Sequence, residues 1–308
     1  MRKGVKYFNN PSALVIKLFH KVAAILPDKI YIRIQYRLYT GKILNLDNPQ
    51  RFTEKIQWLK LNNRRPEYTS LVDKITVKDY VAAKLGKEYI IPTLGVWNNA
   101  DKIDYSVLPD QFVLKTNHSG GNSGVVICKN KSQFDKTSAK RRLNKSLKRD
   151  DIYKSFREYP YKNIERRIFA EAYMQNENDT ELVDYKFYCF NGRAEYCQVI
   201  ANRRTKETID FFDRDWTHMP FYGLNPKCGP AAKPAAKPAA YDEMLRIADV
   251  LSSEIPFLRV DLYYINGNVY FGELTFFPAS GLGRFTPDEW DYKLGEILKL
   301  DNITVISD

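Results

Sequence analysis

Four polar side chains recur at alternating positions in a β-rich segment near the end of the chain, residues 257–277. Arg259 and Asp261 lie two residues apart in one predicted strand, and Glu273 and Thr275 lie two residues apart in the next. Alternate residues of a strand share a face, so each pair points to one side of the sheet. Two carboxylates brought together there repel each other unless a cation stands between them, and paired oxygen ligands beside phosphates suit Mg²⁺. A solvated face on which Arg259 neutralises the acids is the alternative.

The turn between these strands decides whether the two acids meet. A two-residue turn at 266–267 would place Asp261 opposite Gly272, with Glu273 on the other face, whereas a three-residue turn at 266–268 would pair Asp261 with Glu273. The three-residue register also segregates apolar from polar side chains, so we predict it. Its apolar face would hold Val260, Leu262, Tyr264, Tyr270, Leu274 and Phe276.

A glycine-rich loop follows a strongly predicted strand at 112–116. From Lys115 the sequence reads Lys-Thr-Asn-His-Ser-Gly-Gly-Asn-Ser-Gly, and a second short strand is predicted at 125–127. Glycines let backbone N–H groups approach phosphate oxygens, and a lysine at the strand end can neutralise them. The lysine precedes the glycines and no helix follows, so this is not a Walker A loop. An ordinary glycine-rich hairpin is the alternative.

A charged strand precedes a second turn signal. Asn-Gly at 191–192 predicts a hairpin, and Asp184, Lys186 and Tyr188 share one face of the strand before it. Continued pairing would bring Arg203 to the same face. This face is either a charged wall of a site or a surface exposed to solvent.

The remaining pattern predicts the elements that must position these groups. Helical segments are predicted at 12–65 with breaks at Pro27, near Gly41 and at 48–49, at 52–59 with Thr53 as a cap, at 67–86 and at 133–149. Further strands are predicted at 90–93 and at 169–174, the latter with one carboxylate, Glu171. Residues 230–240 repeat Ala-Ala-Lys-Pro and predict an extended, mobile surface linker.

The composition is that of a globular protein. The chain has 308 residues, of which 44% are hydrophobic and 28% charged. Four cysteines without a Cys-x-x-Cys motif exclude a disulfide scaffold and a thiolate zinc site, and three scattered histidines argue against a histidine-based metal site. The apolar stretch at 13–26 is too short to span a bilayer and lacks the features of a signal peptide. We therefore expect a cytoplasmic protein with reduced cysteines.

The net charge of +11 is concentrated at the start of the chain. Residues 1–66 hold 14 Lys and Arg against 3 Asp and Glu, whereas the other 242 residues hold 34 of each. Such a region suits an anionic membrane surface or a polyanionic glycan, and nothing resembles a nucleic-acid-binding motif. A helical apolar stripe with basic neighbours runs through it, at Val15, Leu18, Phe19, Val22 and Leu26. It fits an interfacial helix, or a helix packed on the protein's own core with a solvated basic face.

Taken in order, these segments resemble the ATP-grasp superfamily, and more closely its teichuronopeptide-biosynthesis (TupA-like) branch, over roughly residues 45–300. The most specific stretches lie at 52–58, 71–78, 112–124, 184–187 and 271–281. The resemblance implies an α+β protein in which two lobes with mainly antiparallel sheets sandwich ATP. We expect a basic helical region at 1–66, a lid lobe at 67–168, and a second lobe at 169–308 that carries the hairpin 257–277 and the insert 229–240.

The resemblance also implies a nucleotide site. Lys74 and Lys115 match its two lysines, and Asp184 matches a contact to the ribose. The loop 119–124 matches a lid over the β- and γ-phosphates and comprises Ser119, Gly120, Gly121, Asn122, Ser123 and Gly124. The hinge that holds adenine is matched by Glu171 with the backbone of Ala172, Tyr173 and Met174.

The catalytic and metal positions follow from the same resemblance. Asp261 and Glu273 match two Mg²⁺ carboxylates. Thr275 stands where many members have Asn, and its hydroxyl is a poorer ligand than an amide oxygen. Arg259 matches the arginine that steadies the phosphoryl and tetrahedral species. Two further catalytic candidates come from the charged face described above, namely Lys186 and Arg203.

The activity that the resemblance implies is amide formation. Such enzymes usually transfer the γ-phosphate of ATP to a carboxylate, and an amine then displaces phosphate from the acyl phosphate. The branch points to cell-surface polysaccharide, where a uronic acid or glycan carboxylate could be joined to an amino acid or other amine; the reverse polarity, with an amino-acid carboxylate and an amino sugar, is equally allowed. The basic N-terminal region would then bind a polyanionic glycan or a lipid-linked intermediate, with peripheral association at the inner membrane face.

Two other functions stay open at this point. One is a glycosyltransferase or phosphotransferase of the same pathway. The other is a non-catalytic nucleotide-binding or membrane-associated partner, against which the intact set of Lys115, Arg259, Asp261 and Glu273 speaks.

Overall fold

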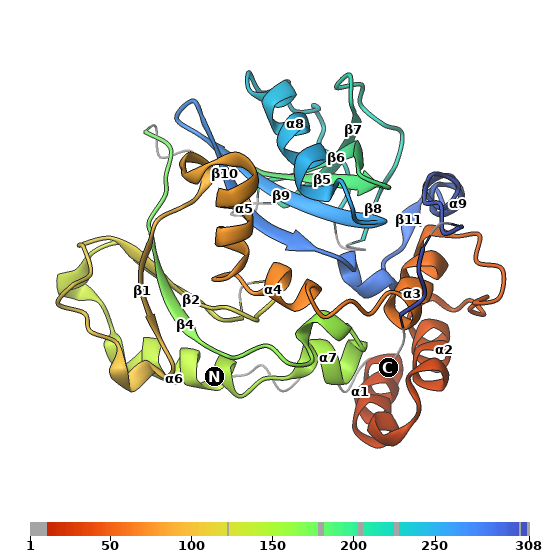
Figure 1. Cartoon of the computed structure of the whole chain (residues 1–308), viewed down its shortest axis with the longest axis horizontal. Coiled ribbons are helices and arrows are strands. Elements are labelled where there is room, and N and C mark those ends of the chain that lie inside the picture. The colour runs from red at the N-terminus through yellow and green to blue at the C-terminus, as the bar shows by residue number, and fades with distance from the viewer. Residues whose placement is uncertain are drawn as a thin grey trace.

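Two antiparallel β-sheets organise the molecule, which we describe from a computed structural model (Figure 1). The structure describes residues 11–121, 123–177, 182–202, 206–224, 228–301 and 303–306. The helices are α1 (Pro11–Val22), α2 (Asp28–Thr40), α3 (Phe52–Asn62), α4 (Tyr68–Val72), α5 (Val77–Leu85), α6 (Lys136–Leu147), α7 (Asp151–Phe156), α8 (Tyr241–Ser252) and α9 (Glu289–Ile297). The expected α+β class and the antiparallel character of the sheets are confirmed.

The first sheet has the strand order β1-β4-β2-β3. Its strands are β1 (Thr93–Trp97), β2 (Phe112–Thr116), β3 (Val125–Cys128) and β4 (Ile168–Ala172). Phe112 and Leu114 alternate with half-buried residues along β2 and form a core with Leu143 of α6, which packs on β2 and β3. The predicted strands at 112–116 and 125–127 are thus present. The basic helix begins later than predicted, because the side chain of Asp135 caps it by accepting a hydrogen bond from the backbone N–H of Ser138.

The second sheet has the order β10-β9-β5-β6-β7, and a short pair, β8 and β11, lies beside it. The strands are β5 (Asp184–Phe190), β6 (Arg193–Ala201), β7 (Thr208–Asp213), β8 (Tyr222–Gly223), β9 (Phe257–Ile265), β10 (Asn268–Thr275) and β11 (Phe285–Thr286). The apolar face of α8 packs on β5, β6 and β9, as Figure 1 shows at the top of the molecule. The hairpin predicted from Asn191-Gly192 is present, with both residues at positive φ.

Helix α3 ties the N-terminal region to the second sheet. Phe52, Ile56 and Leu59 belong to the same core as that sheet, and α3 packs against α9. Thr53 is not the cap that we predicted, since the helix begins at Phe52. Its backbone N–H and hydroxyl instead donate to the carboxylate of Asp291 in α9, at 2.9 and 2.8 Å. The start of α3 is therefore fixed both by this tertiary contact and by a local cap, in which the Glu54 carboxylate accepts a hydrogen bond from the backbone N–H of Arg51 at 3.1 Å.

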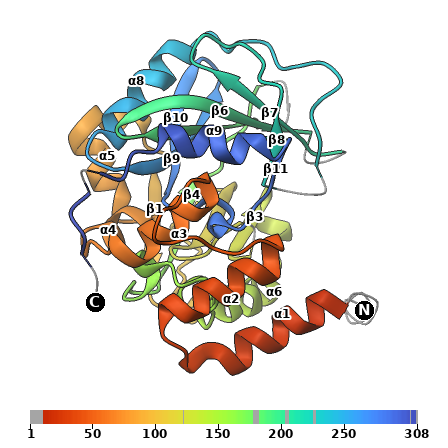
Figure 2. The ribbon, with the colours of Figure 1, turned by 90° about the vertical axis from the view of Figure 1, so that its right-hand side faces the viewer.

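Helices α1 and α2 form a hairpin on one side of the molecule (Figure 2). The helices break at Pro27 and at Gly41, as predicted, and Gly41 ends α2 with a left-handed φ of 76°. Tyr31, Ile32 and Tyr36 form a small core on the inner side. No helix within the described ranges is long and apolar enough to cross a membrane.

Three other sequence predictions need correction. The helix predicted at 67–86 is two helices, because the chain turns at 73–76, where the carboxylate of Asp73 accepts a hydrogen bond from the N–H of Ile75. The strand predicted at 90–93 begins only at Thr93. The proposed lobe boundary at 168/169 is wrong, because it cuts through β4, which pairs with β1 and β2 of the first sheet. The division of the chain into lobes stays a prediction.

The insert at 229–240 contains no helix or strand and contacts the surface at defined points. The backbone N–H of Ala231 donates to the carboxylate of Asp210, and the carbonyl of Ala235 accepts from the indole N–H of Trp216 at 3.1 Å. The position of the insert at the surface agrees with the prediction, and its extended form and mobility stay predictions.

Candidate functional site

Asp261 and Glu273 face each other across β9 and β10, as predicted, but for a different reason. The turn is the two-residue one at 266–267, with both residues at positive φ, which is the conformation that Asn-Gly favours. A β-bulge at Gly272 then shifts the register by one residue, so that Glu273 and not Gly272 meets Asp261.

Because of the bulge, the apolar face that we predicted for this hairpin is wrong in part. Val269 and Phe271, which precede Gly272, are buried with Leu262, whereas Tyr270 pairs with Tyr263 on the other face. The predicted alternation holds only beyond the bulge, where Leu274 faces Val260.

Arg259 lies between the two carboxylates. Its Nε and Nη2 donate to the carboxylate oxygens of Asp261 at 2.6 and 2.8 Å, and Nη2 also approaches Glu273 at 3.4 Å and the hydroxyl of Thr275 at 3.0 Å. Only 4% of the Asp261 side chain and 12% of the Arg259 side chain are exposed. The alternative of a solvated polar face is therefore wrong, although Arg259 does neutralise the pair.

Strand β5 adds a lysine to this group. Lys186 pairs in register with Asp261, and its ammonium contacts the carboxylate of Asp261 and lies 3.6 Å from that of Asp184. Tyr188 is opposite Arg259 on the same face. Asp184, Lys186 and Tyr188 are all buried, so this face is a charged wall inside the molecule and not a solvent-exposed surface. Arg203, the remaining predicted member of the wall, lies outside the described residues.

Lys74 connects the two sheets. Its backbone N–H donates to the carbonyl of Asn117, which follows β2, and its ammonium forms an ion pair with Glu273 of β10 at 2.8 Å. Burial alone would raise the pKa of Glu273, but the cations Lys74, Lys186 and Arg259 together hold that pKa well below its ordinary value. Glu273 is therefore ionised over the whole physiological range.

Asn117 holds the turn that carries Lys74. Its amide donates to Asp73 at 2.8 Å and to the carbonyl of Glu165, and its own side-chain oxygen accepts from the N–H of Arg167. These bonds fix the connection between β2, β4 and the turn before α5. The position of Lys74 is thus set by a buried polar network.

A second pair of lysines converges on Glu171 in the first sheet. Lys115 of β2 and Lys78 of α5 both form ion pairs with its carboxylate, and the Lys78 contact measures 2.6 Å. Burial would raise the pKa of Glu171, and the two lysines lower it below its ordinary value. Residues 172–174, predicted as the rest of an adenine hinge, continue from β4 and are half-buried. Their role stays a prediction.

The glycine loop after β2 is held at its two ends by hydroxyl groups. The Oγ atoms of Thr116, Ser119 and Ser146 lie 2.5 to 2.8 Å from one another. A Cβ atom on Gly124 would lie 2.0 Å from Thr116 Oγ1, so only glycine allows this approach. Gly121, at the tip, has a φ of 58° and no atom near its missing Cβ. Asn122 lies outside the described residues.

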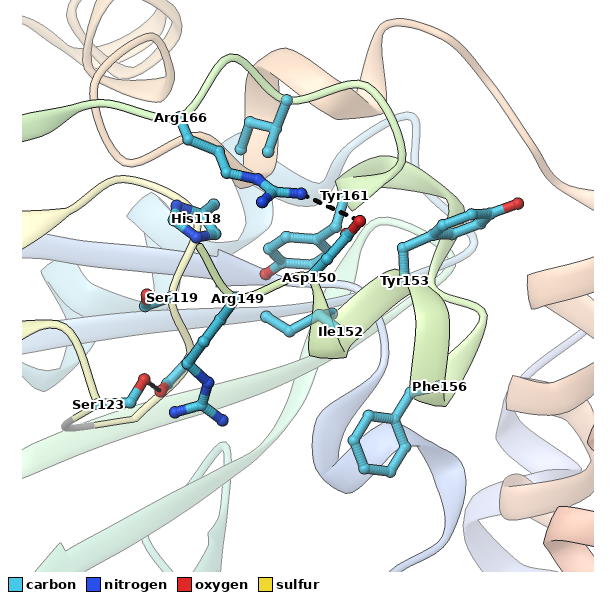
Figure 3. A pocket seen from close by; sticks show the side chains of 12 residues that line it. His118, Ser119, Ser123, Arg149, Asp150, Ile152, Tyr153, Phe156, Tyr161 and Arg166 are labelled. Carbon is cyan, nitrogen blue, oxygen red and sulfur yellow. Dashed lines mark hydrogen bonds and ion pairs between the residues drawn. The ribbon is translucent and has the colours of Figure 1, made fainter. Parts of the chain in front are cut away.

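A small pocket of about 120 Å³ lies behind this loop (Figure 3). Ser119 and Ser123 come from the loop, and Arg166 and Asp150 point toward each other with an ion pair of 3.0 Å. Burial is the main cause that lowers the pKa of His118, and the positive charge of Arg166 lowers it further. His118 therefore lines this pocket as a neutral ring. The pocket backs the loop and adjoins the larger cleft described next.

The larger cleft has a volume of about 890 Å³ and is lined by Glu273 of the carboxylate pair but not by Asp261. Lys74, Arg259, Glu273 and Thr275 line one part, and Gly120 and Gly121 of the glycine loop line another. Its remaining wall is largely aromatic and apolar and includes Tyr39, Phe156, Tyr161, Tyr222, Leu224, Phe277 and Leu282. Clefts of this size hold small organic ligands.

The donor set fits a nucleotide with a hard divalent cation. Asp261 and Glu273 offer carboxylate oxygens side by side, which is the chemistry that Mg²⁺ prefers, and the remaining ligands of Mg²⁺ are usually phosphate oxygens and water. Among the described residues, no group of three or more His, Cys, Asp or Glu side chains could hold a metal by itself. Phosphates require positive charge nearby, and the assignment of Lys74 and Lys115 to this role stays a prediction.

Sequence reasoning missed several residues that this geometry brings in. Lys78 could have been found, because it stands four residues after Lys74, which is one turn further in the helix predicted at 67–86. Asn117 lies in the predicted loop but carried no separate signal. Glu158 and Ser280, which also line the cleft, have no pattern in the sequence that marks them.

Three comparisons with known proteins were made. A family model described as TupA-like ATPgrasp matches residues 54–299. A D-alanine–D-alanine ligase from Bacillus anthracis has a similar structure, with 15% identity, a TM-score of 0.43, and coverage of 74% of this chain and 66% of that chain. PurK, N5-carboxyaminoimidazole ribonucleotide synthetase, in its ADP complex, has 14% identity, a TM-score of 0.41, and coverage of 72% and 50%.

A third similar structure is that of ATP-grasp ligase PsnB complexed with a phosphomimetic variant of its minimal precursor, Mg and ADP. It has 9% identity, a TM-score of 0.41, and coverage of 76% of this chain and 60% of that chain. The chain thus spans between half and two thirds of the length of these structures. No curated protein gives a significant match. The family model covers most of the sequence, including both strands of the acidic hairpin. The family predicted from the motifs is therefore confirmed, and the chain belongs to the TupA-like ATP-grasp family.

Proposed function

We propose that this protein is an ATP-dependent carboxylate–amine ligase that forms an amide bond through an acyl phosphate. One observation carries the proposal: Glu273, which pairs with Asp261 across β9 and β10 and lies beside Lys74 and Arg259, lines a cleft that the glycine loop also lines. Phosphoryl transfer needs positioning and charge neutralisation more than acid–base chemistry, and this group of residues supplies both.

Each part of the site has a defined task in this proposal. Lys115 and Lys74 neutralise the phosphates, and Asp261 and Glu273 hold Mg²⁺, which supplies further neutralisation when bound. Arg259 steadies the transferred phosphoryl group and the tetrahedral species, because its planar fork suits bidentate contacts to oxygen. The glycine loop excludes water from the acyl phosphate.

The proposed substrates are a carboxylate of a cell-surface polysaccharide and an amine. Membership of the TupA-like branch supports this class, and the cleft is large enough for one sugar residue with its amine partner. A uronic acid with an amino acid or other amine is the proposed pairing, and an amino-acid carboxylate with an amino sugar is its reverse.

Product formation from Mg-ATP tests this function. The purified protein is incubated with Mg-ATP and pools of uronic acids and amines, and ADP and phosphate are measured. Release that requires both pools supports the ligase. Binding of Mg-ATP without turnover indicates a polymeric or lipid-linked acceptor, and membrane fractions would then replace the pools. Failure to bind Mg-ATP contradicts the proposal.

The proposed place of action is the inner face of the cell membrane. On α1 and the turn after it, Leu18, Lys21, Val22 and Ile25 are all exposed, and their spacing puts them on one helix face. On α2, Ile30, Arg33, Ile34 and Arg37 repeat this spacing and are also exposed. We call these eight residues the N-terminal face.

The apolar stripe predicted in this region is divided between two environments. Phe19 and Leu26 pack against the inner core of the hairpin, and His20 bonds to Tyr31 and Tyr39 there. Leu18, Val22 and Ile25 are 60%, 67% and 91% exposed. Apolar side chains interleaved with cations are the pattern of a helix that lies at an anionic lipid surface.

Vesicle binding should therefore depend on the N-terminal face. Lys21→Gln/Arg33→Gln/Arg37→Gln should weaken binding of the full chain to phosphatidylglycerol vesicles by about 100-fold, since each cation near such a surface contributes about 1 kcal/mol. Leu18→Ser/Val22→Ser/Ile25→Ser should weaken it as well. Co-sedimentation measures both effects.

The matched control removes two exposed cations of α6 and the exposed lysine that follows it, with Arg141→Gln/Lys145→Gln/Lys148→Gln. It should bind nearly as the unmodified chain does. An equal loss in this control would mean that net charge alone drives binding. Concentration-dependent dimers that disappear in the Leu18→Ser/Val22→Ser/Ile25→Ser variant would mean that a second copy covers the face.

A further inference from the structure

A buried glutamate, Glu158, lines the cleft beside the proposed phosphate-binding residues. Glu158 is only 9% exposed and lines the same cleft as Arg259 and Glu273. It follows α7 directly, and Arg157 before it adopts a left-handed conformation with φ of 55°. The guanidinium of Arg157 donates to the carbonyls of Lys154 and Ala24, which fixes this turn. The carboxylate therefore has a set position.

Lys60 and Ser280 support Glu158 from α3 and from the turn after β10. The Lys60 ammonium is fully buried and donates to the carbonyl of Phe156 at 3.0 Å and to both the carbonyl and the hydroxyl of Ser280 at 2.7 Å. Lys60 and the Ser280 hydroxyl both lower the pKa of the Glu158 carboxyl group, against the effect of burial. All three N–H donors of the Lys60 ammonium are thus used by acceptors other than Glu158. The positive charge of Lys60 still stabilises the ionised form of the Glu158 carboxyl group.

The turn that carries Ser280 is itself held in a strained conformation. Ala279, Ser280 and Gly281 all have positive φ, and Gln57 of α3 donates to the carbonyls of Ser280 and Gly281 at 2.9 and 2.8 Å. Backbone strain of this kind persists where the surroundings over-determine it, and it concentrates at functional sites. Helix α3 thereby fixes one wall of the cleft.

Glu158 differs in its surroundings from the other acid of the cleft. Glu273 forms ion pairs with Lys74 and Arg259. Arg259 interacts with Glu158 only by longer-range electrostatic attraction. A buried carboxylate in a cleft with an aromatic wall is suited to accept a cationic group of a ligand. In the proposed pairing of a uronic acid with an amine, only the amine carries such a group.

We propose that Glu158 binds the ammonium group of the amine co-substrate and accepts the proton that this group must lose. This inference rests on the proposed ligase function and names the place of its second substrate. Lys60 and Ser280 are positioning residues, since they act through Glu158.

The proposed step balances as follows. The ammonium transfers one proton to the Glu158 carboxylate, and the free lone pair of the nitrogen forms the new bond to the acyl carbon. The bond between that carbon and the phosphate oxygen breaks, and its electron pair leaves with the phosphate. The second proton of the nitrogen is released with the phosphate, so that an amide and inorganic phosphate result.

The electrostatic surroundings agree with this role. Burial raises the pKa of Glu158 to about 7, against the opposing effects of Lys60, the Ser280 hydroxyl and Arg259. Burial likewise lowers the pKa of Lys60 to about 8. Tyr161 also faces Glu158, and burial keeps its phenol protonated because the pKa is raised. A base that titrates near neutral pH can both take and release a proton.

Hydroxylamine separates the two halves of the reaction. It is a neutral nucleophile, so it traps the acyl phosphate without an ammonium site. In Glu158→Gln we expect hydroxamate formation within about threefold of the unmodified enzyme, and amine-dependent amide formation reduced by about 100-fold or more, with a raised KM for the amine. The rise of kcat/KM for the amine with pH through about 7 should also disappear, because the base must be deprotonated to act.

Glu54→Gln is the matched control, since Glu54 is similarly buried but lies outside the cleft. It should leave the ratio of amide to hydroxamate unchanged, and thermal unfolding of both variants checks that they are folded. Equal loss of hydroxamate and amide in Glu158→Gln would show a structural role and overturn the inference, as would unchanged amide formation. Absence of hydroxamate from the unmodified enzyme would instead refute the ligase function itself.

Discussion

Replacing Asp261 by Asn and Glu273 by Gln together should reduce ADP release from Mg-ATP by at least about a thousandfold, because a single preorganised charge contact in such sites already contributes 10²- to 10³-fold. Both substitutions keep the shape of the side chain and remove its charge. Lys74 and Arg259 would then lose their carboxylate partners, Lys186 would keep only Asp184, and the site would lose its affinity for Mg²⁺. The measurement is coupled detection of ADP at saturating substrates.

Asp249→Asn is the control for this result. Asp249 forms an ion pair with Arg214 at 3.0 Å and accepts from the N–H of Ala194, outside the cleft. Its loss should lower stability modestly and leave turnover per folded molecule unchanged. Circular dichroism of the double variant must show that it is folded, since it retains buried cations. Turnover within tenfold of the unmodified protein, in a folded double variant, would contradict a metal role for the two acids.

Arg259→Lys should lower kcat by about 100-fold or more and change the KM for ATP far less. Lysine keeps the positive charge, but its single ammonium cannot reproduce the planar fork that contacts Asp261, Glu273 and Thr275 together. The transition state would lose an oriented contact while the ground state keeps most of its charge balance. Steady-state kinetics with the identified substrates measures the split between kcat and KM.

Arg214→Lys provides a matched test of the arginine fork. Arg214 also makes a two-pronged contact, with Asp249 at 3.1 and 3.0 Å, but it does not line the cleft. Both substitutions remove a comparable contact from the protein, and only the one at Arg259 should affect catalysis. If Arg259→Lys keeps more than half of the activity, Arg259 serves only to neutralise the acids.

Thr275 and Arg259 are coupled in this arrangement. The hydroxyl of Thr275 accepts a hydrogen bond from Arg259, so the residue that the resemblance placed among the metal ligands also orients the arginine. A threonine suits this contact because a hydroxyl accepts from a guanidinium at short range. Its part in metal binding stays a prediction.

Local sequence patterns were sufficient to predict those parts of the site that lie within one hairpin, strand or loop. The acidic hairpin, the glycine loop and the charged strand at 184–190 each carry a pattern of period two or a turn signal, and backbone geometry translates such patterns directly into faces and turns. The pairing of Asp261 with Glu273 followed from the segregation of faces even though the turn was assigned one residue too long. The bulge at Gly272 was not predictable, because it depends on how both strands twist against their neighbours.

Tertiary packing determines which residues contact the side chains on these faces. Nothing in the local pattern distinguishes a charged strand in solvent from one in the interior, and Lys186 proved to be buried because β9 supplies its counter-charge. Lys60, Glu158 and Ser280 come from three distant segments, and each alone would be an ordinary surface residue. They meet because α3 packs beside the turn after β10, and burial then requires that each charge be paired. Local periodicity fixes which way a side chain points, and only packing fixes its partners.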